Sequence, residues 1–239
     1  PLYKRPTRGR FVAVADIDEL KQVEHGADEV SIGASVTHRG LAGLGGDLAV
    51  LSEAARGTPR AVGNVATLAG NICARPYPAA DLVPALLSLD AVVEVASVSG
   101  RARVPVTDFE PAPGQLVTRA IVARRPRARS AYERLTVRRG GEESVASVAL
   151  WVELDADGTV CEARVAFGSV EERSRRCREA ETLLTGGPLL ESRAQEAGRA
   201  AAGALAAIDA PDAPAWYRLR VLPTLLGRAA ARLVSPESP

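Results

Sequence analysis

One stretch, residues 63–81 (GNVATLAGNICARPYPAAD), constrains the fold of this chain more than any other. It brings small residues, hydroxyl and amide side chains and two prolines close together. Small residues let a backbone approach a ligand, and free N–H groups in such a turn can form an anion-binding concavity. Thr67 and Asn71 would add donors, and Asp81 would be the N-cap of a helix over residues 82–89. A ligand-binding turn and a plain tight connection between a strand and a capped helix both fit this pattern.

Three motifs occur here in a fixed order: ATLAGNI at residues 66–72, PAAD at 78–81 and PALLSLDA at 84–91. This succession resembles the A-T-L-G-G-N, P-A-A-D and P-x-L-L-A-L-D-A signature of the FAD-binding medium subunit of molybdenum hydroxylases. Carbon monoxide dehydrogenase and xanthine dehydrogenase belong to that family. Segments similar to the C-terminal domain of the family follow within residues 155–170, 178–186 and 217–229, so the resemblance covers nearly all of the chain.

The resemblance implies an oxidoreductase subunit with FAD as its cofactor. The protein supplies position and electrostatics while the isoalloxazine does the redox work. The implied partners are a molybdopterin-binding large subunit and a 2Fe-2S small subunit, and the electrons would leave to NAD or another acceptor. The chain has no iron–sulfur cysteine spacing, so we expect the clusters to belong to partners.

The same resemblance implies where the cofactor would bind. Residues 67–71 would lie against the flavin and its phosphate-bearing tail, Ile72 and Cys73 near the ring, and Asp81 would hydrogen-bond the cofactor. Val117 falls at an apolar contact to the ring, and Arg134 falls where the family usually has a lysine that would stabilise a reduced, anionic flavin. An ordinary core position for Val117 and a surface position for Arg134 stay open as alternatives. The full set is Ala66, Thr67, Leu68, Ala69, Gly70, Asn71, Ile72, Cys73, Asp81, Val117 and Arg134.

Three departures from the family pattern bear on cofactor binding. Ala69 replaces the first glycine of the usual pair, which could crowd a close backbone approach. Gly63 stands where the family often has arginine. The first phosphate-cradling loop of the family, an A-G-G-T-D-L-like turn expected before residues 16–20, is absent from the sequence, as though about one βαβ unit, ~30 residues or more, were missing.

These departures leave two hypotheses for the function. The chain contains no methionine and opens on PLYKRP, which indicates an N-terminal truncation, although removal of an initiator before Pro1 would leave the same sequence. We therefore expect the chain alone to bind FAD weakly or not at all. The leading hypothesis is an electron-transfer flavoprotein subunit, and the alternative is a non-catalytic scaffold that keeps the fold and partner interface without FAD.

Composition narrows the other possibilities. The 239 residues carry a net charge of +1, so nothing favours a nucleic-acid or acidic membrane partner. No apolar run is long enough to span a membrane, and three cysteines without paired spacing favour a reduced, cytoplasmic setting. We find no hydrolytic triad and expect no metal site. The lone histidines His25 and His38 should face solvent.

The hydrophobic pattern predicts an α+β fold in two domains. The first, residues 1–125, would be a partial FAD-binding α/β domain, and the second, residues 130–239, a small antiparallel sheet with helices. A basic linker at residues 124–129 would separate them, and Asp47 would cap a helix over residues 48–55. Strands are expected at residues 11–15, 30–37, 92–95, 101–106, 116–123, 144–154 and 160–167. Further helices are expected at residues 82–89, 177–184, 191–208 and 215–233.

Overall fold

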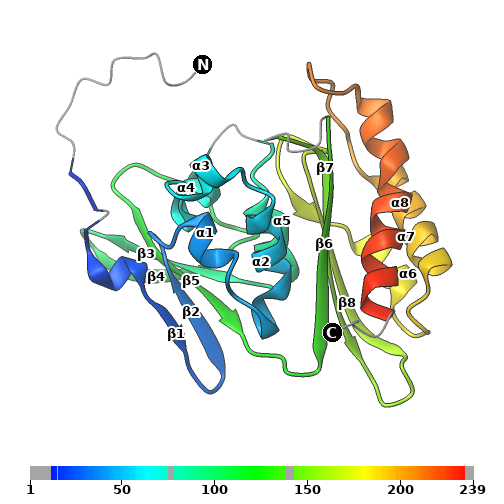
Figure 1. Cartoon of the computed structure of the whole chain (residues 1–239), viewed down its shortest axis with the longest axis horizontal. Coiled ribbons are helices and arrows are strands. Elements are labelled where there is room, and N and C mark those ends of the chain that lie inside the picture. The colour runs from blue at the N-terminus through cyan, green and yellow to red at the C-terminus, as the bar shows by residue number, and fades with distance from the viewer. Residues whose placement is uncertain (1–11, 15, 75–77, 138–142, 235–239) are drawn as a thin grey trace.

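The computed structural model describes residues 12–14, 16–74, 78–137 and 143–234. In the view of Figure 1 they form successive layers: a first sheet, a group of short helices, a second sheet and a group of longer helices. Every described pair of neighbouring strands is antiparallel. The expected α+β class is therefore confirmed.

The first half of the chain builds the first sheet and the short helices. The sheet has the order β1-β2-β5-β3-β4. Its strands are β1 (Val23–His25), β2 (Glu29–Gly33), β3 (Val92–Ser97), β4 (Gly100–Pro105) and β5 (Leu116–Ala123). The helices are η2 (Asp18–Lys21), α1 (His38–Leu41), η3 (Gly46–Leu48), α2 (Ala49–Arg56), α3 (Arg60–Gly63), α4 (Leu68–Cys73) and α5 (Leu82–Ser88).

The second half builds the other two layers. Its sheet has the order β6-β7-β8-β9. The strands are β6 (Ala128–Thr136), β7 (Ser144–Leu154), β8 (Val160–Gly168) and β9 (Arg175–Arg176). The helices on the far side of this sheet are α6 (Arg178–Leu184), α7 (Glu191–Ala204) and α8 (Ala215–Val234).

Strand β7 is apolar at nearly every position because both of its faces are covered. Successive side chains of a strand point to opposite faces. Leu150 and Val152 lie in the core formed with α6, α7 and α8. Ala149 and Trp151 lie in the core that also contains the first sheet and the short helices. The second sheet is therefore a wall shared by both halves of the chain, as Figure 1 shows.

Several predicted elements are confirmed with their bounds or nearly so. The strands expected at residues 116–123 and 144–154 are β5 and β7. The strands expected at residues 92–95 and 101–106 are β3 and β4, which pair as a hairpin. The helix expected over residues 82–89 is α5.

One further predicted element is wrong and two are shorter than expected. Residues 12–14 are not a strand, and Phe11 and Ala15 lie outside the described residues. The strand expected over residues 30–37 ends at Gly33. The chain there passes close to η2, since a Cβ at Gly33 would lie 2.3 Å from the Leu20 carbonyl oxygen. The helix expected over residues 191–208 ends at Ala204.

The basic segment was also interpreted wrongly in part. Residues expected as a linker already belong to β6 from Ala128 onward. Asp47 does not cap α2. Its carboxylate instead accepts hydrogen bonds from the Arg124 side chain and the Arg125 backbone N–H, each at 3.0 Å. Long-range pairing has therefore displaced the local capping interaction.

Within the described ranges, no helix combines the length and the apolar character needed to cross a bilayer.

Candidate functional site

A cavity of about 340 Å³ opens beside α4. Apolar side chains form much of its wall and a few polar groups converge on it, which is the composition of many small-molecule sites. It is built from α1, α3 and α4, from residues 58–59 and 66–67, and from residues 74, 79 and 81 between α4 and α5. The lining residues are His38, Thr58, Pro59, Val62, Ala66, Thr67, Gly70, Asn71, Ala74, Ala79 and Asp81.

The stretch that was expected to be a ligand-binding turn contains a helix, α4. The backbone N–H groups of its first three residues all donate hydrogen bonds within the chain. Thr67 is its N-cap and accepts a hydrogen bond from Gly70 N at 3.1 Å. Leu68 N donates to the Val36 carbonyl at 2.9 Å and Ala69 N donates to the Ala34 carbonyl at 3.0 Å. The prediction of free N–H groups forming an anion-binding concavity is therefore wrong for these three amides, because the segment that follows β2 and the Thr67 cap already use them.

Asp81 stands at the start of α5, but its side chain does not cap that helix. The Leu82 N–H donates instead to Asn71 Oδ1 at 3.2 Å. The Asp81 carboxylate is directed toward the second sheet, where Oδ1 accepts hydrogen bonds from Tyr132 Oη at 2.8 Å and Ser144 Oγ at 2.7 Å. Burial raises the pKa of Asp81, and these hydrogen bonds oppose that rise.

Arg134 completes this cluster. Its Nη1 donates to Asp81 Oδ2 at 2.9 Å, and its Nη2 donates to the carbonyl oxygen of Gly57. The guanidinium lies directly over Gly57, since a Cβ at that residue would be 2.6 Å from Arg134 Cζ. Arg134 does not line the cavity beside α4. Asp81 does line this cavity, so the Arg134 guanidinium lies behind the Asp81 carboxylate as seen from the cavity.

Two models of known protein families match the chain and together cover nearly all of it. Residues 3–124 match the FAD binding domain in molybdopterin dehydrogenase. Residues 130–233 match the CO dehydrogenase flavoprotein C-terminal domain. The chain belongs to this flavoprotein family. FAD is thus its cofactor, and the chain is a medium-type subunit of an oxidoreductase complex, as the resemblance predicted.

Individual relatives agree with this assignment. The subunit alpha of the 6-hydroxypseudooxynicotine dehydrogenase complex of Paenarthrobacter nicotinovorans is 27% identical over 96% of this chain and 81% of that protein. The glyceraldehyde dehydrogenase medium chain of Sulfolobus acidocaldarius is 26% identical over 89% of this chain and 79% of that protein. Both are named as parts of larger enzymes.

Solved structures share the fold. The reconstituted CO dehydrogenase from Oligotropha carboxidovorans gives a TM-score of 0.83 at 24% identity, covering 92% of this chain and 80% of that chain. The quinoline 2-oxidoreductase from Pseudomonas putida 86 gives a TM-score of 0.82 at 24% identity with the same coverage.

The cavity of this flavoprotein suits part of an FAD molecule. Its volume is at the lower end of the range of about 300–1,000 Å³ that is usual for ligand pockets, enough for a ring system but not for a whole dinucleotide. Three acceptor positions of Asp81 are occupied, and a carboxylate has about four, so one is left for a donor of the ligand. This acceptor position suits an N–H or O–H donor of a flavin, whereas the first turn of α4 offers the phosphates no free amide.

The structure distributes the predicted cofactor residues among several places. Ile72 is buried and lines a different cavity. Leu68 and Val117 are buried in the core of the first half, and Ala69 and Cys73 pack against that core. The methyl group of Ala69 therefore does not line the cavity. The predicted residues that do line it are Ala66, Thr67, Gly70, Asn71 and Asp81.

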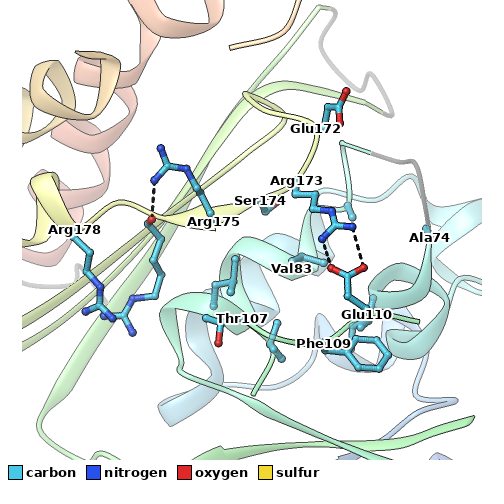
Figure 2. Close-up of a pocket in the computed structure, with 15 residues that line it drawn as sticks. Ala74, Val83, Thr107, Phe109, Glu110, Glu172, Arg173, Ser174, Arg175 and Arg178 are labelled. Carbon is cyan, nitrogen blue, oxygen red and sulfur yellow. Dashed lines mark hydrogen bonds and ion pairs between the residues drawn. The ribbon is translucent and has the colours of Figure 1, made fainter. Parts of the chain in front are cut away.

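The cavity that Ile72 lines has about 270 Å³ and lies where the two halves meet (Figure 2). Val83 and Phe109 contribute apolar surface, and arginines of the segment at residues 173–178 surround it. Each of these arginines is already paired with a carboxylate, as with Arg173 and Glu110 in Figure 2. This cavity therefore offers less to an anionic ligand than its arginines suggest.

His38 is a lining residue that sequence reasoning missed. The prediction that it faces solvent is wrong, because it is buried and its Nδ1 lies 2.7 Å from Thr58 Oγ1. Burial lowers the pKa of His38. His25 is exposed, as expected.

Gly57, Tyr132 and Ser144 were also missed. Tyr132 and Arg134 lie two positions apart on β6 and share a face of the strand. That alternation was a signal that could have linked Tyr132 to the predicted cation. No comparable signal exists for Ser144 or Gly57. In the part of the chain that the structure describes, no group of three or more His, Cys, Asp or Glu side chains could hold a metal ion.

Proposed function

We propose that this chain is the electron-transferring FAD subunit of a molybdenum hydroxylase complex, and that the flavin ring binds in the cavity beside α4. One observation carries the proposal. The motif that identifies the family folds into the wall of a cavity that joins an apolar surface to a partly satisfied carboxylate.

The residues of the chain would bind and orient the cofactor. Pro59, Val62 and Ala66 would supply apolar contact to a planar ring, and the Asp81 carboxylate would accept one N–H or O–H donor. Asn71 would hold the start of α5 against α4 through its bond to Leu82 N. When bound, FAD supplies the redox chemistry, while the walls fix its position and exclude water.

The proposal extends to partners and setting. We infer a 2Fe-2S small subunit as the electron donor, a molybdopterin-binding large subunit as the site of substrate oxidation, and NAD or another acceptor. The names of the relatives, which are subunits or chains of dehydrogenases, support this inference. A domain boundary at residues 125–130 stays a proposal, supported by the ranges of the two family matches. A cytoplasmic setting stays a proposal that rests on the cysteine pattern of the sequence.

A scaffold without FAD is the second candidate function, and a specific observation favours it. The amides of Leu68, Ala69 and Gly70 are bonded within the chain, so α4 gives a pyrophosphate no amide there. The two functions differ in flavin content. The absorbance spectrum of the purified chain, before and after incubation with FAD and gel filtration, tests them. Retained, near-stoichiometric flavin supports the flavoprotein and refutes the expectation from the sequence that the chain alone binds FAD weakly or not at all. A flavin-free protein at saturating FAD supports the scaffold.

A further inference from the structure

A buried polar cluster joins the two halves of the chain directly behind the proposed flavin cavity. Its members are Asp81 on the first half and Tyr132, Arg134 and Ser144 on the second. Asp81 is 7% exposed, Tyr132 5% and Ser144 2%. Hydrogen bonds to a charged, buried acceptor are stronger than neutral ones. The cluster therefore fixes one carboxylate through three donors from another layer.

Arg134 is itself fixed from a third element. Gly57 follows α2, and its carbonyl accepts from Arg134 Nη2. The absence of a side chain at Gly57 is what lets the guanidinium lie there, since a Cβ would be 2.6–2.8 Å from three of its atoms. The guanidinium is thus held between Gly57 and Asp81, and only Asp81 reaches the cavity.

On the basis of the function proposed above, we propose that Tyr132, Ser144 and Arg134 are positioning residues of the flavin cavity. They hold the Asp81 carboxylate so that its one unused acceptor position receives an N–H or O–H donor of FAD. Arg134 then acts on the cofactor through Asp81 and not by touching the ring. Cofactor binding and the packing of the second sheet on the short helices become coupled, because β6 and β7 carry the donors and α5 carries the acceptor.

The first test is Tyr132→Phe in the full chain, with Tyr217→Phe as the matched control. Tyr217 is 36% exposed on α8 and outside the cluster. FAD affinity is measured by quenching of flavin fluorescence on titration with protein. Tyr132→Phe should raise the Kd by about tenfold, the factor expected for loss of one hydrogen bond to a charged group. Tyr217→Phe should leave the Kd unchanged.

A purely structural role is separated by a double-mutant cycle. If Tyr132 acts through Asp81, the tenfold effect of Tyr132→Phe should vanish in an Asp81→Asn background. Additive effects of the two substitutions would overturn the proposal. If Tyr132→Phe does not fold, Ser144→Ala replaces it in the double-mutant cycle with Asp81→Asn, because Ser144 Oγ is the other donor to Asp81 Oδ1.

The outcomes separate this inference from the function on which it rests. A wild-type chain with no affinity for FAD overturns the proposed function and the inference together. A wild-type chain that binds FAD, beside Tyr132→Phe and Ser144→Ala variants that bind equally well, overturns the inference alone. Gly57→Ala adds a further check, because it displaces the guanidinium without changing any charge and should weaken binding as Tyr132→Phe does.

Discussion

The packing of α7 on α8 rests on Gly198, and replacing this glycine tests the structure of the second half. A Cβ at Gly198 would lie 2.5 Å from Pro223 Cα, 2.9 Å from Pro223 N and 3.0 Å from the Leu222 carbonyl oxygen. These are backbone atoms, which cannot move aside as the end of a flexible side chain can. Gly198→Ala must therefore push α7 away from α8.

Two opposing effects decide the magnitude. Alanine is favoured over glycine inside a helix by about 1 kcal/mol. Overpacking typically costs about 1–3 kcal/mol, and contact with backbone at this distance belongs at the upper end. The net loss should be about 2 kcal/mol, or a fall in Tm of about 4–8 °C for a chain of this size. Gly203 on the same helix has nothing within 4 Å of such a Cβ, so Gly203→Ala should gain about 1 kcal/mol and raise Tm by about 2–4 °C.

The assay is thermal unfolding of both variants beside the wild type, followed by circular dichroism. Opposite signs for the two substitutions are expected. If Gly198→Ala were as stabilising as Gly203→Ala, helix propensity alone would govern this site, and the close contact between α7 and Pro223 would be refuted.

Three further predictions concern the cavity and the cysteines. Thr67→Ala removes the cap of α4 and should cost about 1 kcal/mol of unfolding free energy and weaken FAD binding; an unchanged FAD affinity in this variant would contradict the proposed site. Burial raises the pKa of Asp81, so protonation of this carboxyl stabilises the fold fully below its ordinary pKa, and this contribution is lost as pH rises through the raised value. Asp81→Asn carries no titrating group there, so its unfolding free energy, measured in urea across the acidic range, should rise relative to that of the wild type as pH rises. A difference that stays constant with pH would contradict this. Burial raises the pKa of Cys177 to about 11, so iodoacetamide at pH 8 should label exposed Cys161 and spare Cys177 until the chain is unfolded, as mass spectrometry of peptides can show.

The strands and helices that depend on neighbouring residues could be predicted from local sequence patterns. Asp155, with two turn residues and Gly158, forms the turn between β7 and β8, and the alternation on each side is enough to specify both strands. Helix α5 could likewise be predicted from the run of apolar residues at 82–89. The cavity wall at Thr67, Gly70 and Asn71 could be located from the motif, although its helix was not foreseen.

What could not be predicted depends on partners far along the chain. Asp81 looks like a helix cap in the sequence, but its partners lie 51, 53 and 63 residues away. Asp47 fails as a cap for the same reason. Its carboxylate accepts hydrogen bonds from Arg124 and Arg125, which lie 77 and 78 positions further along the chain. His38 is polar and has polar neighbours in sequence, yet the meeting of α1 with residues 58–59 buries it. Tertiary pairing outweighs local preference at each of these sites.

A crystal structure of the chain with FAD would show whether the cavity beside α4 holds the flavin ring. We expect electron density for the isoalloxazine among Pro59, Val62 and Asn71, with one donor of the cofactor within hydrogen-bond distance of Asp81 Oδ2. Density for the ring in the arginine-lined cavity of Figure 2, or no ordered ring at saturating FAD, would contradict it.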